Sequence, residues 1–172
     1  ISYSFSLILA IIMISLLSFL IKIFFPKYVG VGIYVVILTI GVLFFALWTL
    51  FNTYLAGKLE TNKALIPICL AAIWNIILDI ILIPKYGLLG ICIATLTAHI
   101  IAFTLIAIKM NLLRMFIWVY PLSFIPLLAF YLKHYGLILI FLAVPLLFLF
   151  KLINMEDIKI IKDIIFDMVK IK

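Results

Sequence analysis

The chain has 172 residues, of which 70% are hydrophobic and 11% charged, and its mean hydropathy is +1.51. This composition excludes a soluble globular domain, because a globule of this size cannot hide so much apolar surface from water. The net charge of +7 does not indicate nucleic-acid binding, because the Lys and Arg residues lie in short loops and a tail without a continuous basic face. We expect them to contact the anionic headgroups of membrane lipids.

Six apolar stretches approach the roughly 20 residues that an α-helix needs to cross a bilayer. They cover about 5–25, 33–55, 64–83, 88–108, 115–132 and 135–151, with short breaks that contain Pro, Gly and Lys. Such runs are too long for the strands of a membrane barrel. We therefore expect an all-α fold, a polytopic transmembrane bundle of about six helices over residues 1–153.

The first stretch begins at once, at Ile1. It lacks the basic region and the cleavage site of a signal peptide, so we interpret the chain as one whose natural start lies upstream. Ser15, Ser18 and Lys22 form a polar line at helical spacing. Lys22 either reaches the membrane surface with its long side chain or faces a cavity, where it could attract a phosphate.

The third stretch contains an acidic residue, Asp79, inside an otherwise apolar run. A carboxylate surrounded by lipid is costly, so Asp79 should face a cavity or a neighbouring helix. Asn75 lies one turn earlier on the same face. Both residues are candidates for the wall of a substrate or ion pathway. The alternative is that Asp79 reaches water or bonds a neighbouring helix without any role in transport.

The fourth stretch has a small residue at every fourth position, namely Gly90, Ala94, Ala98 and Ala102. Such a stripe lets another helix approach closely, and we expect the third stretch to pack against it. Thr95 and His99 stand beside the stripe, one turn apart. His99 is either a structural hydrogen-bonding residue or a proton-relay residue.

Prolines set the last two stretches apart. Pro121 and Pro126 lie in the fifth and Pro145 in the sixth, and they predict kinks because proline removes a backbone donor. Residues 154–172 form a predicted amphipathic helix, typical of a segment that lies in the membrane interface. If the chain starts inside, nine of the 13 Lys and Arg residues share the side of this tail, which favours a multi-pass plasma-membrane protein with a cytoplasmic C-terminus.

Catalytic and metal-binding patterns are absent from the sequence. Cys69 and Cys92 lie in apolar runs without metal-site spacing, so we interpret them as reduced packing residues. There is no Gly-rich phosphate loop, no cluster of metal ligands and no nucleophile with a base. We predict no metal, no cofactor and no enzymatic activity.

Residues 75–96 read NIILDIILIPKYGLLGICIATL. This segment closely resembles the Wzx-type polysaccharide-biosynthesis flippases of the multidrug/oligosaccharidyl-lipid/polysaccharide (MOP) exporter superfamily. The likeness consists of a helix ending in Ile-Pro, a Tyr-Gly turn and a Gly/Ala-containing helix with Ala-Thr. PKY at 26–28 and LAGK at 55–58 extend it. Asp79 and His99 depart from it, since Asn and Tyr are common at those places in the family.

The resemblance implies a MATE-like fold in which this chain supplies the last six of fourteen helices and needs a missing N-terminal lobe. It implies a flippase that moves polyprenyl-pyrophosphate-linked oligosaccharide units across the plasma membrane by alternating access, with H⁺ or Na⁺ as the coupling cation. Asn52, Asn75, Asp79 and His99 would line the sugar side, and Lys22 would meet the pyrophosphate. The proline-broken last two helices would form a groove for the lipid tail.

Three other functions stay open at this point. A cation-coupled multidrug exporter of the same superfamily would use Asp79 as its coupling carboxylate, and drug efflux without a glycan defect would favour it. A membrane-embedded glycosyl- or acyltransferase would need His99 or His134 as a base. A non-catalytic membrane subunit is the third.

Overall fold

The computed structural model describes residues 2–132, 135 and 138–149, and within these ranges the side chains of some residues, Lys22 among them, are not described. The described part is all-helical, without a strand, so the predicted all-α class is confirmed. The amphipathic tail predicted over 154–172 lies outside the described residues.

The described elements are eight α-helices and one 3-10 helix. In chain order they are α1 (Ser2–Phe24), η1 (Pro26–Val31), α2 (Gly32–Gly57), α3 (Asn62–Tyr86), α4 (Leu88–Lys109), α5 (Leu113–Phe116), α6 (Val119–Ser123), α7 (Ile125–Leu132) and α8 (Ile138–Leu149). Three of them, α2, α3 and α4, are long and apolar enough to cross a membrane. Two shorter apolar helical stretches are Tyr3–Leu17 and Val119–Leu132.

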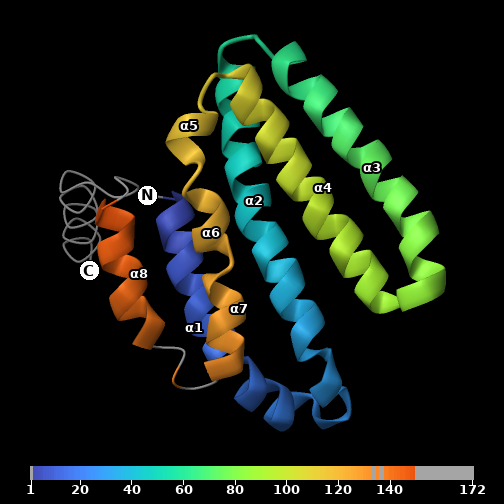
Figure 1. The fold of residues 1–172 in the computed structure, drawn as a ribbon, viewed down its shortest axis with the longest axis vertical. Coiled ribbons are helices and arrows are strands. Elements are labelled where there is room, and N and C mark those ends of the chain that lie inside the picture. Colours follow the sequence, from blue (N-terminus) through green and yellow to red (C-terminus); the bar gives the residue numbers. More distant parts are fainter. Residues whose placement is uncertain (1, 133–134, 136–137, 150–172) are drawn as a thin grey trace, which may run out of the picture.

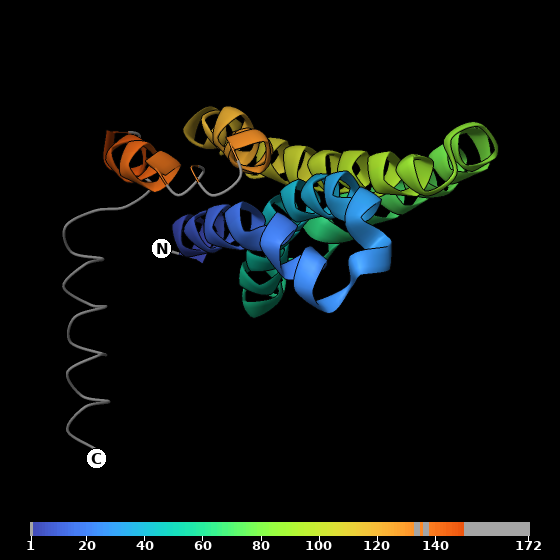
Figure 2. The ribbon, with the colours of Figure 1, turned by 90° about the horizontal axis from the view of Figure 1, so that it is seen from below.

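The helices form two layers. Figure 2 shows α1 and α2 in one row and α8, α7 and α4 in the other. α2 packs against α4, and α1 against α7. α3 lies at the outer edge of the molecule and packs mainly against α4 (Figure 1). Its surface is therefore largely uncovered, as a helix surrounded by lipid can be, because lipid tails are as apolar as its side chains.

The core forms where α2 faces α1, α4 and α7. Buried apolar residues recur every three or four positions along α2, which puts them on one face of the helix: Val36, Ile40, Leu43, Phe44 and Leu47. Aromatic rings continue this face toward α4, with the Phe44 and Phe103 centroids 5.7 Å apart. The hydroxyl groups of Tyr120 and Thr104 are 2.6 Å apart and connect the segment after α4 to α4 itself.

The predicted break between the third and fourth stretches contains both Pro84 and Gly87, and the helix pair α3–α4 turns at the glycine. The third stretch was predicted to end at residue 83, but α3 continues through Pro84 to Tyr86. Proline removes the hydrogen bond to the carbonyl four residues earlier and weakens that turn, but the helix is continuous here. The turn comes at Gly87, which has a φ of +55° and donates its N–H to the Ile83 carbonyl at 2.8 Å. Glycine adopts this backbone conformation without steric cost.

The fifth stretch is interrupted, as its prolines predict. It consists of three short helices, α5, α6 and α7, and the first break lies at Ile117, four residues before Pro121. A proline ring clashes with the carbonyl four residues earlier. The Tyr120 N–H instead donates to the Ile117 carbonyl at 3.4 Å, in a tighter turn. By contrast, α8 is continuous through Pro145.

Candidate functional site

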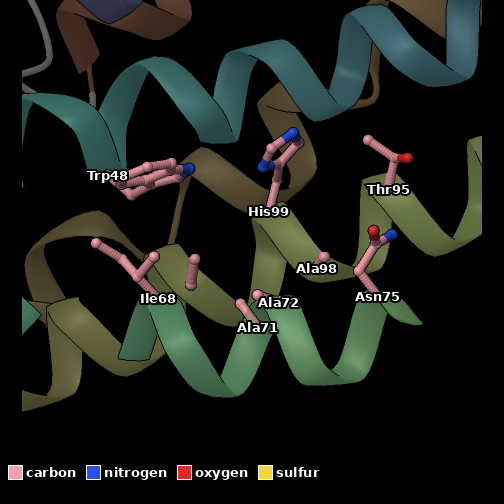
Figure 3. Close-up of a pocket in the computed structure, with 9 residues that line it drawn as sticks. Trp48, Ile68, Ala71, Ala72, Asn75, Thr95, Ala98 and His99 are labelled. Atoms are coloured by element: carbon pink, nitrogen blue, oxygen red, sulfur yellow. The ribbon is translucent and has the colours of Figure 1, made fainter. Parts of the chain in front are cut away.

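A pocket of about 180 Å³ lies between α2, α3 and α4 (Figure 3). α2 contributes one aromatic residue, and α3 and α4 contribute mostly small and uncharged polar ones. The lining residues are Trp48, Ile68, Ala71, Ala72, Asn75, Thr95, Ala98, His99 and Ala102. The pocket therefore opens within the three helices that have the length and composition of membrane spans.

The hairpin α3–α4 brings two predicted site residues together here. Asn75 projects from α3 and His99 from α4, and both line the pocket. The two residues are equally far, twelve positions, from Gly87 at the turn. At 1.5 Å per residue this places both at about 18 Å from the turn. The equal spacing from Gly87 predicts that Asn75 and His99 lie at the same depth. This spacing can be read from the sequence alone.

Three buried polar atoms near the pocket lack a hydrogen-bond partner within the described part of the chain. They are Trp48 Nε1, Asn75 Nδ2 and Asp79 Oδ1. Leaving one such group unpaired costs about 1–3 kcal/mol. Nearly all buried polar groups in proteins have a partner, so a partner for these three is expected from outside the described residues.

Aromatic rings hold the α2 side of the pocket in place. The Phe45 ring contacts both Trp48, at 5.2 Å between centroids, and His99, at 5.3 Å. A Cβ atom added to Gly41 would lie 3.4 Å from His99 Cδ2 and 3.5 Å from the Cα atom of Leu96. A Cβ atom at position 41 would therefore make only ordinary van der Waals contacts with α4 beside His99.

The small-residue stripe of α4 is buried along its whole length, from Gly90 to Ala102. At its start, a Cβ atom on Gly90 would lie 2.6 Å from the carbonyl of Leu82 on α3. Farther along, Ala98 and Ala102 line the pocket, and Ala94 is fully buried. The stripe therefore lies against α3 at the turn and leaves open space farther from it.

One hydrogen bond connects α3 and α4 at the side of the pocket. Trp74 Nε1 on α3 donates to the Thr97 hydroxyl on α4 at 3.3 Å. Thr97 in turn donates to the Ala94 carbonyl at 3.0 Å. This bond joins the two helices beside the pocket.

The other predicted site residues lie apart from the pocket lining. Asp79 is half-buried on α3, one turn beyond Asn75, and Asn52 is half-buried on α2, one turn beyond Trp48. The side chain of Lys22 lies outside what the structure describes. Trp48 is the site residue that sequence reasoning missed. Its position one turn from Asn52 is the only sequence signal for it.

The basic residues whose side chains are described lie near the ends of the long helices. The lysines and the arginine near the α2–α3 and α4–α5 connections are Lys58, Lys63, Lys109 and Arg114, and at the opposite end are Lys27 and Lys85. Among the described residues no group of three His, Cys, Asp or Glu side chains could hold a metal ion. Cys69 and Cys92 are both free thiols.

No protein-family model, no curated protein and no solved structure matches the chain. The function of the pocket is therefore inferred from its own residues and from the sequence resemblance.

Proposed function

We propose that the chain is one lobe of a membrane flippase that moves polyprenyl-pyrophosphate-linked oligosaccharide units across the plasma membrane. In this proposal α2, α3 and α4 cross the bilayer, and the pocket between them lies on the path of the polar cargo. A second lobe of similar helices completes the path on its open side.

One observation carries the proposal: unpartnered polar groups occur inside helices that are otherwise apolar. Trp48, Asn75 and Asp79 each bury a hydrogen-bonding atom without a partner in the described chain. Intramembrane polar groups are costly and are found mainly where they face an aqueous path or a bound ion. A purely structural membrane helix would gain no stability from an unpaired polar group, because burying one costs free energy. This arrangement supports a transport function.

The carboxylate of Asp79 supports coupling of the transport to a cation. Asp79 follows Asn75 by one turn on α3, and its Oδ1 atom lacks a partner in the described part. A proton or a sodium ion would supply the missing partner and would neutralise the charge within the membrane. We propose H⁺ or Na⁺ as the coupling ion at this residue.

A flipping assay with Asp79→Asn tests the proposal. The protein is reconstituted in vesicles that contain a polyprenyl-pyrophosphate-linked disaccharide, and an external lectin reports the disaccharide that reaches the outer leaflet. We expect the ion-dependent flipping rate to fall by about tenfold or more, as for the loss of a buried charged partner. Glu60→Gln, an equal change of charge in the exposed α2–α3 loop, should leave the rate unchanged. Equal rates for Asp79→Asn and the unmodified protein would refute the role of this residue.

The same carboxylate favours one second candidate, a cation-coupled multidrug exporter. Its cargo would be an apolar cation instead of a lipid-linked glycan. Efflux of ethidium from the same vesicles, driven by a sodium or proton gradient and lost in Asp79→Asn, would support this candidate. Lectin-detected flipping without ethidium efflux would exclude it.

A further inference from the structure

The C-terminal end of α2 contains a leucine in a backbone conformation that leucine rarely adopts. Leu59, two residues after the helix, has a φ of +58°. Its N–H donates to the Ala56 carbonyl at 3.0 Å, and the Glu60 N–H donates to the Leu55 carbonyl at 2.9 Å. These two bonds form the Schellman motif, in which the left-handed residue is usually glycine, because a side chain there is crowded. Leucine at this position is therefore unfavourable for the helix end itself.

α4 ends with the same motif but with a residue that suits it. Asn111 has a φ of +57°, and asparagine tolerates this conformation better than leucine does. The two helix ends therefore differ in the side chain at the tip, which is polar on α4 and apolar on α2. Leu59 is 92% exposed, more than any other large hydrophobic side chain of the described chain. Such a side chain contributes almost nothing to packing within the described residues.

Lysines lie close to this exposed leucine. The ends of α2 and α4 and the start of α3 meet in a small apolar cluster of Leu55, Ala64 and Ile106 (Figure 1). Lys58 and Lys109 each come three residues after a member of this cluster, and both are exposed. Lys58 Nζ lies 4.6 Å from the centroid of the Tyr54 ring. Glu60 is paired with Lys63 instead. Neither Lys58 nor Lys109 forms an ion pair with a described residue, so both can bind an anion from outside them.

An apolar tip beside two unpaired cations matches the boundary between lipid headgroups and acyl chains. α2 and α4 have the length and composition of membrane spans, so their common end lies at the depth of a membrane surface. At that depth acyl chains can cover an apolar side chain, while long lysine side chains reach the phosphate groups. Two lysines without a carboxylate partner favour a lipid with a net negative charge over a zwitterionic one.

We propose that the α2–α3 connection binds an anionic phospholipid. Leu59 inserts below the headgroups, and Lys58 and Lys109 contact the lipid phosphate. Beyond the general attraction of basic residues to a membrane, this assigns one loop as the contact site and gives it an apolar anchor. The inference does not depend on the cargo of the proposed flippase.

Fluorescence quenching by spin-labelled lipids tests the insertion of Leu59 in the full chain. The background protein carries Cys69→Ser and Cys92→Ser, and a bimane probe is attached at either Leu59→Cys or Asn111→Cys, the equivalent position after α4. Nanodiscs contain phosphatidylglycerol with a nitroxide near the top of its acyl chain. We expect the probe at position 59 to be quenched at least several times more strongly than the probe at position 111.

Two pairs of charge substitutions test the headgroup preference, with the probe kept at position 59. Lys58→Gln with Lys109→Gln removes the two phosphate contacts, and Lys27→Gln with Lys85→Gln removes the same charge at the opposite end of the long helices. Quenching by labelled phosphatidylglycerol is compared with quenching by equally labelled phosphatidylcholine. We expect the first pair to lower the preference for phosphatidylglycerol by about fivefold for each lysine. The second pair should leave it unchanged.

Helical content by circular dichroism shows whether each variant is folded. If the variant with both Lys58→Gln and Lys109→Gln does not fold, Lys109→Gln alone should still lower the preference by about fivefold.

Equal quenching at positions 59 and 111 would overturn the insertion of Leu59. Equal quenching by the two lipids, or a preference that survives the loss of Lys58 and Lys109, would overturn the anionic headgroup site. The lectin assay keeps this inference apart from the proposed function. Flipping that depends on Asp79 without lipid quenching at position 59 refutes only the lipid site. Lipid quenching at position 59 without any flipping supports the lipid site and refutes the proposed function.

Discussion

Polar side chains inside the helices are few, and this is why some of them were predictable. Asp79 and Asn75 are conspicuous in the sequence because each interrupts a long apolar run. Trp48 was not predictable, since an indole is common in membrane helices and only the tertiary structure shows whether its N–H finds an acceptor. That Asn52 does not line the pocket also depends on how α2 is rotated, which its nearly uniform apolar sequence does not specify.

Tyr3 illustrates a polar residue whose partners lie far away in the sequence. Its hydroxyl group lies 2.8 Å from the Ser123 hydroxyl and donates to the Val119 carbonyl at 3.2 Å, so that α1 is tied to α6. We expect Tyr3→Phe to lower the free energy of unfolding by about 1 kcal/mol, which corresponds to a fall in Tm of about 2–4 °C. Thermal unfolding in detergent measures it. Tyr131→Phe, at a residue that is 70% exposed, should leave Tm unchanged.

The loop between α2 and α3 contains an ion pair outside the predicted spans. Lys63 Nζ lies 2.8 Å from Glu60 Oε2, and this hydrogen bond lowers the pKa of the Glu60 carboxyl. A lowered pKa in the folded state stabilises the loop above the ordinary carboxyl pKa, and the effect is lost as pH falls through the lowered value. Carbon-13 NMR of the Glu60 carboxyl should show a pKa that rises to an ordinary value in Lys63→Gln. An identical pKa in both proteins would contradict the role of the pair.

At the scale of helices, existence and approximate length were predictable, whereas ends and breaks were predictable only in part. Apolar length gave α2, α3 and α4 within a few residues of their observed bounds. Proline alone did not predict where helices break. The fifth stretch breaks near Pro121, but α3 continues through Pro84 and α8 through Pro145. A proline ring only weakens one turn, and the packing around that turn decides whether the helix breaks.

The close approach of α3 and α4 depends on a single glycine. We expect Gly90→Val to push Leu82 away and to destabilise the protein by about 1–3 kcal/mol, the usual cost of overpacking, because a Cβ atom would lie 2.6 Å from the Leu82 carbonyl. A Cβ atom on Gly57, at the end of α2, has no neighbour within 4 Å. Gly57→Val is therefore the control, and thermal unfolding of both variants side by side makes the comparison. A similar loss in both variants would mean that the proximity to Leu82 is unimportant.

At the scale of the whole molecule, the uncovered apolar surface of α3 and the pocket beside it indicate two different surroundings. Ile76, next to Asn75 in the sequence, is 60% exposed, and a bilayer would cover it with lipid. Asn75 is half-buried and lines the pocket, which the transport proposal fills with water. We therefore expect Asn75 to contact water although it is half-buried. We expect Ile76 to be shielded from water although it is geometrically exposed.

Thiol labelling in membranes compares these two positions directly. The background protein carries Cys69→Ser and Cys92→Ser, and each test protein adds either Asn75→Cys or Ile76→Cys. Maleimides react with the thiolate, which forms only in contact with water. We expect the thiol at position 75 to be labelled at least several times faster than the thiol at position 76. Faster labelling at position 76, in the order of geometric exposure, would contradict both the membrane crossing of α3 and the hydrated pocket.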